Sequence, residues 1–315
     1  MNNLPNIVFL DEYSLGGADL GAIRALGNYT GHATTERDEI AAHCAGAEIV
    51  ITNKVPLKRE TLRALPDLKL VCIAATGMNH VDLEAAAELG IAVRNAAGYS
   101  THSVAETTIG GAIALRRQIV YYDHYVKTRY ADSPLQYHFG RPTHQLHGSH
   151  WGIVGLGEIG REVARIATAL GCEVRYASTS GVVREEPYPA MTLCELLAWA
   201  DVVSIHCPLN DRTRNLVDAP ELAIMKSSAL LINVARGGIV NEAALAEALD
   251  RGTLAGAALD VFSREPIGAD NPLLRVKDPY KLLLSPHNAW SPQEAVKVLV
   301  ERIADNIAEY LAHGN

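Results

Sequence analysis

The feature that most constrains the fold is a glycine-rich turn halfway along the chain. An apolar run, Trp151 to Leu156, leads into a G-x-G-x-x-G turn, and a helical pattern follows from Arg161 to Leu170. In this context the glycines permit a tight turn, close approach of a pyrophosphate and packing of helix on strand, with the phosphate at the helix N-terminus. We predict dinucleotide binding through the six residues of the turn, Gly155, Leu156, Gly157, Glu158, Ile159 and Gly160.

The position of this turn implies a second domain, because about half of the chain precedes it. In the first hundred residues short apolar runs such as Ile7–Leu10, Ile49–Ile51 and Leu68–Ala75 alternate with helical patterns. Such alternation favours βαβ units around a parallel sheet. From Val104 to about Arg129 the pattern is helical throughout and predicts one long helix.

After the turn the alternation resumes, with five apolar runs that end near Ala177, Cys207, Ala235, Val261 and Ser285. A final helix, Pro292–Leu311, has no strand after it and is expected to return to the first domain. The predicted fold is therefore α/β, with two Rossmann-like doubly wound parallel-sheet domains and the active site in the cleft between them. Residues 1–100 and 289–315 would form a flavodoxin-like substrate-binding domain, and residues 101–288 the dinucleotide-binding Rossmann domain.

Charge and composition exclude several classes of function. The chain has 315 residues and a formal net charge of −8, and it contains no cluster of Lys and Arg that would bind a nucleic acid. We expect no membrane partner and a cytoplasmic location, since no long apolar run or leader pattern is visible.

His144, His147 and His150 recur at intervals of three, but Gly140, Pro142 and Gly148 favour a polar loop there, and we expect no metal site.

Three polar residues follow predicted strands in the second half. They are Arg236 in NVARGG, Glu265 in DVFSREP and His287 in SPHNAW. Ligands of open α/β sheets bind beyond the carboxyl ends of the strands, so these residues could meet in one crevice. A histidine can transfer a proton near neutral pH, a carboxylate can orient it, and a guanidinium can bind a carboxylate with two hydrogen bonds.

With these motifs the chain resembles the D-isomer-specific 2-hydroxyacid dehydrogenase family, and most closely its glycerate dehydrogenases, also called hydroxypyruvate reductases. The resemblance covers nearly the whole chain. It implies that Arg236, Glu265 and His287 are catalytic, with His287 exchanging a proton with the C2 oxygen while hydride passes between the nicotinamide and C2. Glu265 would orient His287, and Arg236 would bind the substrate carboxylate.

The resemblance also implies binding residues outside this set. In the stretch ATGMNHVD, Thr76, Gly77 and Met78 would bind the substrate, together with Arg236 and His287, through backbone N–H groups at Gly77 and Met78. Further cofactor contacts are assigned to Cys207, Pro208, Thr213, Val234, Ala235, Asp260 and Ala289.

The choice between NADH and NADPH depends on the end of the second strand. NAD-selective domains carry an acid there, about 20 residues after the turn, to bind the adenosine ribose hydroxyls. Here the strand ends in Ser178, Thr179 and Ser180, and Arg184 lies close by in the sequence. Hydroxyl groups can bind a 2′-phosphate without charge repulsion. We therefore predict that NADPH is favoured over NADH, or that both are used, with the three hydroxyl residues as cofactor contacts.

The expected substrate is a short 2-oxo acid such as hydroxypyruvate or glyoxylate, reduced to the D-2-hydroxy acid. A D-lactate or phosphoglycerate dehydrogenase is an alternative, although no regulatory domain follows Asn315. Formate dehydrogenases share the arginine and histidine but pair the histidine with glutamine rather than an acid. A nucleotide-sensing corepressor is the alternative that is not an enzyme. The resemblance also implies a homodimer formed through the cofactor domain, with the long helix from Val104 as the candidate interface.

Overall fold

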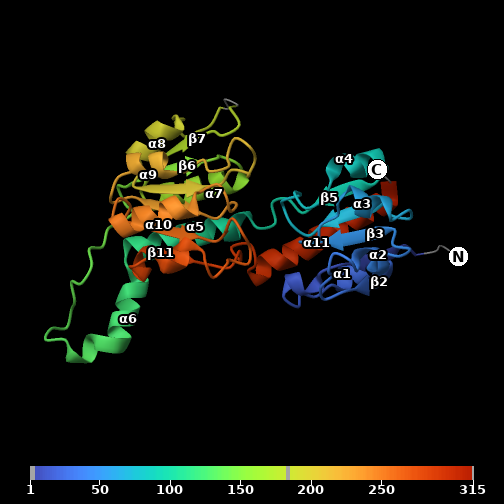
Figure 1. Cartoon of the computed structure of the whole chain (residues 1–315), viewed down its shortest axis with the longest axis horizontal. Coiled ribbons are helices and arrows are strands. Elements are labelled where there is room, and N and C mark those ends of the chain that lie inside the picture. The colour runs from blue at the N-terminus through green and yellow to red at the C-terminus, as the bar shows by residue number, and fades with distance from the viewer. Residues whose placement is uncertain (1–3, 182–184, 314–315) are drawn as a thin grey trace. The chain divides into compact units, whose positions relative to one another are not determined.

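The chain folds into two units, each built around a parallel sheet. The computed structural model describes residues 4–181 and 185–313. Its first unit is Met1–Ser100 with Trp290–Asn315, and its second is Thr101–Ala289. Two parallel-sheet α/β units confirm the predicted fold class (Figure 1). The substrate-binding role of the first unit, the dinucleotide-binding role of the second and the predicted cleft stay predictions.

The first unit has a five-stranded sheet in the order β2-β1-β3-β4-β5, with all neighbouring strands parallel. The strands are β1 (Asn6–Phe9), β2 (Asn28–Gly31), β3 (Ile49–Thr52), β4 (Leu70–Ile73) and β5 (Ala92–Asn95). The α-helices are α1 (Gly21–Arg24), α2 (Ile40–His43), α3 (Arg59–Arg63), α4 (Leu83–Glu88) and α11 (Gln293–His313). Leu299, Ile303 and Ile307 of α11 lie in one buried cluster with Ile7, Ile49 and Leu70 of the sheet, so the C-terminal helix completes the core of this unit.

The second unit has six parallel strands in the order β11-β10-β9-β8-β6-β7. They are β6 (His150–Val154), β7 (Glu173–Ala177), β8 (Val202–Ile205), β9 (Leu230–Asn233), β10 (Gly256–Leu259) and β11 (Leu282–Leu284). The α-helices are α5 (Thr101–Arg116), α6 (Ile119–Arg129), α7 (Glu158–Ala169), α8 (Leu193–Trp199), α9 (Ala219–Ile224) and α10 (Glu242–Arg251). The strand order reverses between β6 and β8, which is where sheets of this kind bind nucleotides.

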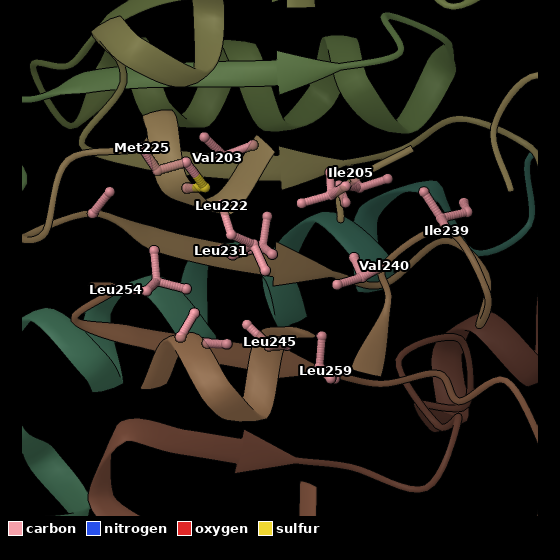
Figure 2. Packing of buried hydrophobic residues seen from close by; sticks show 14 of the residues in the cluster. Val203, Ile205, Leu222, Met225, Leu231, Ile239, Val240, Leu245, Leu254 and Leu259 are labelled. Carbon is pink, nitrogen blue, oxygen red and sulfur yellow. The ribbon is translucent and has the colours of Figure 1, made fainter. Parts of the chain in front are cut away.

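Short 3₁₀ helices complete the assignment at η1 (Glu12–Leu15), η2 (Tyr130–Asp132), η3 (Pro272–Arg275) and η4 (Pro279–Lys281). The core of the second unit lies between the sheet and helices α8 to α10. Val203, Leu231 and Leu259 on neighbouring strands pack with Leu222 of α9 and Leu245 of α10 (Figure 2). This apolar layer fixes the positions of the strand ends.

The single helix predicted from Val104 to Arg129 is wrong, because the chain breaks it at Gln118. This residue has φ +51°, in the left-handed region that is uncommon for residues other than glycine. Its side-chain amide donates to Leu115 O at 2.9 Å, which satisfies a carbonyl at the end of α5. The helix therefore continues in a new direction as α6, which extends away from the sheet of the second unit (Figure 1). The spacing of apolar residues in the sequence gives no signal of such a break.

The helices in the described part of the chain give no candidate for a membrane span, since none combines the length with the apolar character required.

Candidate functional site

The three polar residues predicted at strand ends lie along one edge of the second sheet. Arg236 follows β9, Glu265 follows β10, and His287 follows β11. These three strands are neighbours and run parallel. Their carboxyl ends therefore point the same way, as the sequence predicted.

His287 and Glu265 form a direct pair. Nδ1 of His287 lies 2.6 Å from Oε2 of Glu265. The other carboxylate oxygen of Glu265 accepts a hydrogen bond from the backbone N–H of Phe262 at 3.0 Å. The carboxylate is thus held by its own loop and in turn orients the imidazole. Since Nδ1 is engaged by the acid, Nε2 is the nitrogen that can act on a ligand.

Asp260 holds the loop that carries His287. Its buried carboxylate accepts hydrogen bonds from the hydroxyl of Ser285 at 2.5 Å and from the backbone N–H groups of Asn288 and Ala289, both at 3.0 Å. His287 lies between these anchored residues with φ +52°. Backbone strain of this kind persists only where surrounding contacts enforce it. We predicted Asp260 and Ala289 as cofactor contacts; their observed contacts fix the loop, and the cofactor role stays a prediction.

The Arg236 loop is fixed by a buried asparagine at the end of β9. Asn233 Nδ2 donates to Arg236 O at 2.9 Å, and Asn233 Oδ1 accepts from the backbone N–H of Ala235 at 3.1 Å. The guanidinium is half-buried and donates from Nη1 to Ala235 O at 2.6 Å. This single described hydrogen bond uses one of its five N–H donors, which leaves others for an anion.

Gly237 brings the Arg236 loop against the Glu265 loop. A Cβ atom at Gly237 would lie 1.8 Å from the backbone oxygen of Phe262 and 2.5 Å from the backbone nitrogen of Ser263. Only glycine permits this approach without displacement of the backbone. The two loops therefore hold Arg236 and Glu265 in a fixed relation.

We expect Gly237→Ala to lower the free energy of unfolding by about 1–3 kcal/mol, because the methyl group must displace the Phe262 peptide. Urea unfolding measures the change. Gly110→Ala is the matched control, since a Cβ at Gly110 in α5 meets open space and alanine is the better helix former by about 1 kcal/mol. Equal stabilities of the two variants would contradict the close approach.

The glycine-rich turn has the geometry that a dinucleotide requires. Gly155 has φ +93°, and a Cβ there would lie 2.8 Å from the backbone nitrogen of Cys207. A Cβ at Gly160 would lie 2.4 Å from Gly155 O, so the helix packs directly on the turn. At Gly157 a Cβ would meet open space, which leaves room for a ligand at the N-terminus of α7. The turn at Gly155 and the helix packing at Gly160 agree with the spacing, while the approach of a pyrophosphate at Gly157 stays a prediction.

A pocket opens beside this turn, at the point where the strand order reverses. Eight predicted cofactor residues line it: Gly155, Leu156, Gly157, Ser178, Thr179, Ser180, Cys207 and Pro208. Glu158, Ile159 and Gly160 lie next to it in the first turn of α7. A nucleotide therefore fits the residues present: the N-terminus of α7 would hold its phosphates, and the residues after β7 would bind its adenosine ribose.

The other predicted cofactor residues lie outside the lining of this pocket. Thr213 is fully buried, and its hydroxyl donates to Pro208 O at 2.6 Å, so it shapes the loop that carries Pro208. Val234 and Ala235 follow β9, beside Arg236. Arg184, which we considered as a phosphate contact, lies outside the described residues.

Sequence reasoning missed three residues that line the pocket, namely Tyr176, Glu186 and His206. His206 directly follows β8, and this strand-end position was the signal that could have found it. Burial lowers the pKa of His206 to about 3, so its ring is neutral at pH 7. Both ring nitrogens are buried without a hydrogen-bond partner among the described residues. A neutral imidazole has one donor and one acceptor nitrogen, so His206 has unused hydrogen-bonding capacity beside the pocket.

The predicted substrate residues of the first unit follow β4. Thr76 is exposed, while Gly77 and Met78 are half-buried. The side chain of Asn95 donates to Thr76 O at 2.7 Å, and the backbone N–H of Val81 donates to Met78 O at 3.0 Å. These contacts hold the turn at the carboxyl edge of the first sheet, where ligands of α/β sheets bind.

Comparison with known proteins agrees with this geometry. Residues 109–289 match the family model described as "D-isomer specific 2-hydroxyacid dehydrogenase, NAD binding domain". Glycerate dehydrogenase of Methylorubrum extorquens is 39% identical over 311 residues, which are 97% of this chain and 96% of the relative. Hydroxypyruvate reductase of Blautia hydrogenotrophica is 35% identical over 97% of this chain and 96% of its own. The structure of a glyoxylate reductase from Paecilomyes thermophila superimposes with a TM-score of 0.86 at 26% identity, covering 100% of this chain and 97% of the other.

Proposed function

Because the chain belongs to the D-isomer specific 2-hydroxyacid dehydrogenase family, as its sequence motifs predicted, we propose that it reduces hydroxypyruvate to the D-2-hydroxy acid, or glyoxylate to glycolate, with NAD(P)H. The enzyme class, an oxidoreductase of CH–OH groups, follows from the family itself. The observation that carries the proposed reaction is the His287–Glu265 pair, 2.6 Å between Nδ1 and Oε2, at the strand edge that also holds Arg236.

His287 is the proposed proton donor. A bound nicotinamide cofactor would supply a hydride for C2 of the oxo acid, and this chain must supply one proton at the carbonyl oxygen. With Nδ1 held by Glu265, the protonated imidazole donates this proton from Nε2. In the oxidative direction the neutral ring accepts the proton from the hydroxyl group.

Arg236 is proposed to bind the substrate carboxylate. A guanidinium binds a carboxylate with two parallel hydrogen bonds, and such charge-assisted bonds are roughly twice as strong as neutral ones. The bond from Nη1 to Ala235 O orients the group. The backbone N–H groups of Gly77 and Met78 are proposed as further donors to that carboxylate.

The cofactor pocket supports use of both NADH and NADPH. The family model names an NAD-binding domain. Ser178, Thr179 and Ser180 line the pocket where NAD-selective proteins carry an acid, so the strand end itself does not repel a 2′-phosphate. A carboxylate, Glu186, nevertheless lines the same pocket. We therefore propose dual specificity rather than strict selection of NADPH.

A panel of 2-oxo acids assayed with each nucleotide tests the proposal. Hydroxypyruvate and glyoxylate should be reduced with the highest kcat/KM, and pyruvate and 3-phosphohydroxypyruvate more slowly. Chiral analysis of the glycerate formed from hydroxypyruvate should give the D-isomer. Nucleotide binding without turnover of any oxo acid would overturn the proposal and favour a sensor protein.

We also propose that the second unit forms a homodimer through α6 and the segment after it. Apolar side chains are exposed there: Ile119, Val120, Val126, Leu135, Tyr137 and Phe139, the last 90% exposed. Exposed apolar surface of this extent is typical of protein interfaces. Helix α6 extends away from the sheet of its own unit, so a second copy of this chain can cover these side chains (Figure 1). The mass in solution from light scattering tests this, and a monomer at micromolar concentration would refute it.

A further inference from the structure

An acid is missing at the end of β7, but another acidic residue, Glu186, lines the same pocket. We propose that Glu186, held by Arg161, recognises the adenosine ribose hydroxyls in place of the missing acid and limits the binding of NADPH. This inference rests on the proposed use of a nicotinamide cofactor, and it adds the residue that sets the balance between the two nucleotides.

The end of β7 offers only neutral groups. The strand ends at Ala177, and Ser178, Thr179 and Ser180 follow it at the pocket wall. The hydroxyls of Ser178 and Ser180 lie 3.2 Å apart. Hydroxyl groups donate and accept hydrogen bonds but do not discriminate by charge between a ribose hydroxyl and a 2′-phosphate. Discrimination must therefore come from another residue of the pocket.

Glu186 supplies a negative charge at that place. It lines the same pocket as the three hydroxyl residues and Gly157, although it lies eight residues beyond Ser178. Its side chain is only 8% exposed. A carboxylate in this position can accept hydrogen bonds from ribose hydroxyls and repels a phosphate, which is the function of the usual strand-end acid.

Arg161 fixes this carboxylate. Arg161 Nε donates to Glu186 Oε2 at 3.1 Å, and Nη2 donates to Oε1, so the pair is bidentate. Arg161 belongs to the first turns of α7, where its backbone N–H bonds to Gly157 O at 2.9 Å. Glu186 is thereby connected through Arg161 to the glycine-rich turn. The guanidinium also offsets part of the negative charge, which agrees with a moderate rather than absolute preference.

The test replaces Glu186 by its neutral isostere and measures nucleotide binding in the absence of substrate. For Glu186→Gln, isothermal titration calorimetry should show the ratio of Kd for NADPH to Kd for NADH falling by about tenfold or more, because a charge repulsion is removed. Glu186→Ala should shift the ratio in the same direction. Glu185→Gln is the matched control, with the same change of net charge at an exposed neighbour, and should leave the ratio within about twofold.

The outcomes separate this inference from the proposed function. Three results would overturn the inference while leaving the reduction of oxo acids intact. They are an unchanged ratio of the two Kd values in Glu186→Gln, an equal change of that ratio in Glu185→Gln, and equally weakened binding of both nucleotides in Glu186→Gln. A shifted ratio in a protein that turns over no oxo acid would support the inference and refute the proposed function. A wild-type protein that binds neither nucleotide would refute both.

Discussion

His287→Ala is expected to lower kcat for reduction of the 2-oxo acid by about 10²- to 10⁴-fold, the usual contribution of a positioned acid or base. The proton that the carbonyl oxygen requires comes from this ring in the proposed reaction, and alanine cannot donate it. Steady-state assays with saturating nucleotide measure kcat. NADH and NADPH should still bind, because the glycine-rich turn lies on other strands of the sheet.

The matched control is His102→Ala. His102 also forms a histidine–glutamate pair, 3.0 Å from Nδ1 to Oε1 of Glu162, but its side chain is 81% exposed. Its loss should leave kcat within about twofold, since exposed pairs contribute little. Glu265→Gln should give an intermediate kcat, because glutamine accepts the hydrogen bond from His287 but lacks the negative charge. Near wild-type kcat in His287→Ala would refute the assigned role.

The position of Arg236, Glu265 and His287 at one edge of the sheet could be predicted because it follows from strand order. Arg236, Glu265 and His287 each follow a short apolar run, and parallel strands joined by helices place such residues on the same side. The His287–Glu265 contact confirms that two of them meet. Their roles in catalysis remain predictions that the variants above test.

Other features depend on the path of loops, which apolar patterns do not specify. Glu186 lines the pocket beside the glycine-rich turn although it is distant from that turn in the sequence, and no apolar pattern indicates this position. Asp260 was assigned to the cofactor from resemblance, yet its carboxylate bonds to three groups of the His287 loop. The break at Gln118 depends on one backbone conformation and one side-chain hydrogen bond.

Arg236→Lys should lower kcat/KM for hydroxypyruvate and glyoxylate by about 10²- to 10³-fold, although the charge is kept. A lysine ammonium is a compact point charge and cannot present the two parallel donors that a carboxylate accepts from a guanidinium. A loss of this size corresponds to about 3–4 kcal/mol of transition-state stabilisation. Arg264→Lys, a change of the same kind at an exposed position beside Glu265, is the control and should have little effect.

The two substrates give the sharper test of what Arg236 binds. Hydroxypyruvate and glyoxylate share the carboxylate and the 2-oxo group but differ at C3, which glyoxylate lacks. If Arg236 binds the carboxylate, the variant must lose the same factor of kcat/KM with both substrates, because the interaction removed is common to them. A loss confined to hydroxypyruvate would instead place the guanidinium at the C3 hydroxyl. That result would refute the proposed binding of the carboxylate by Arg236.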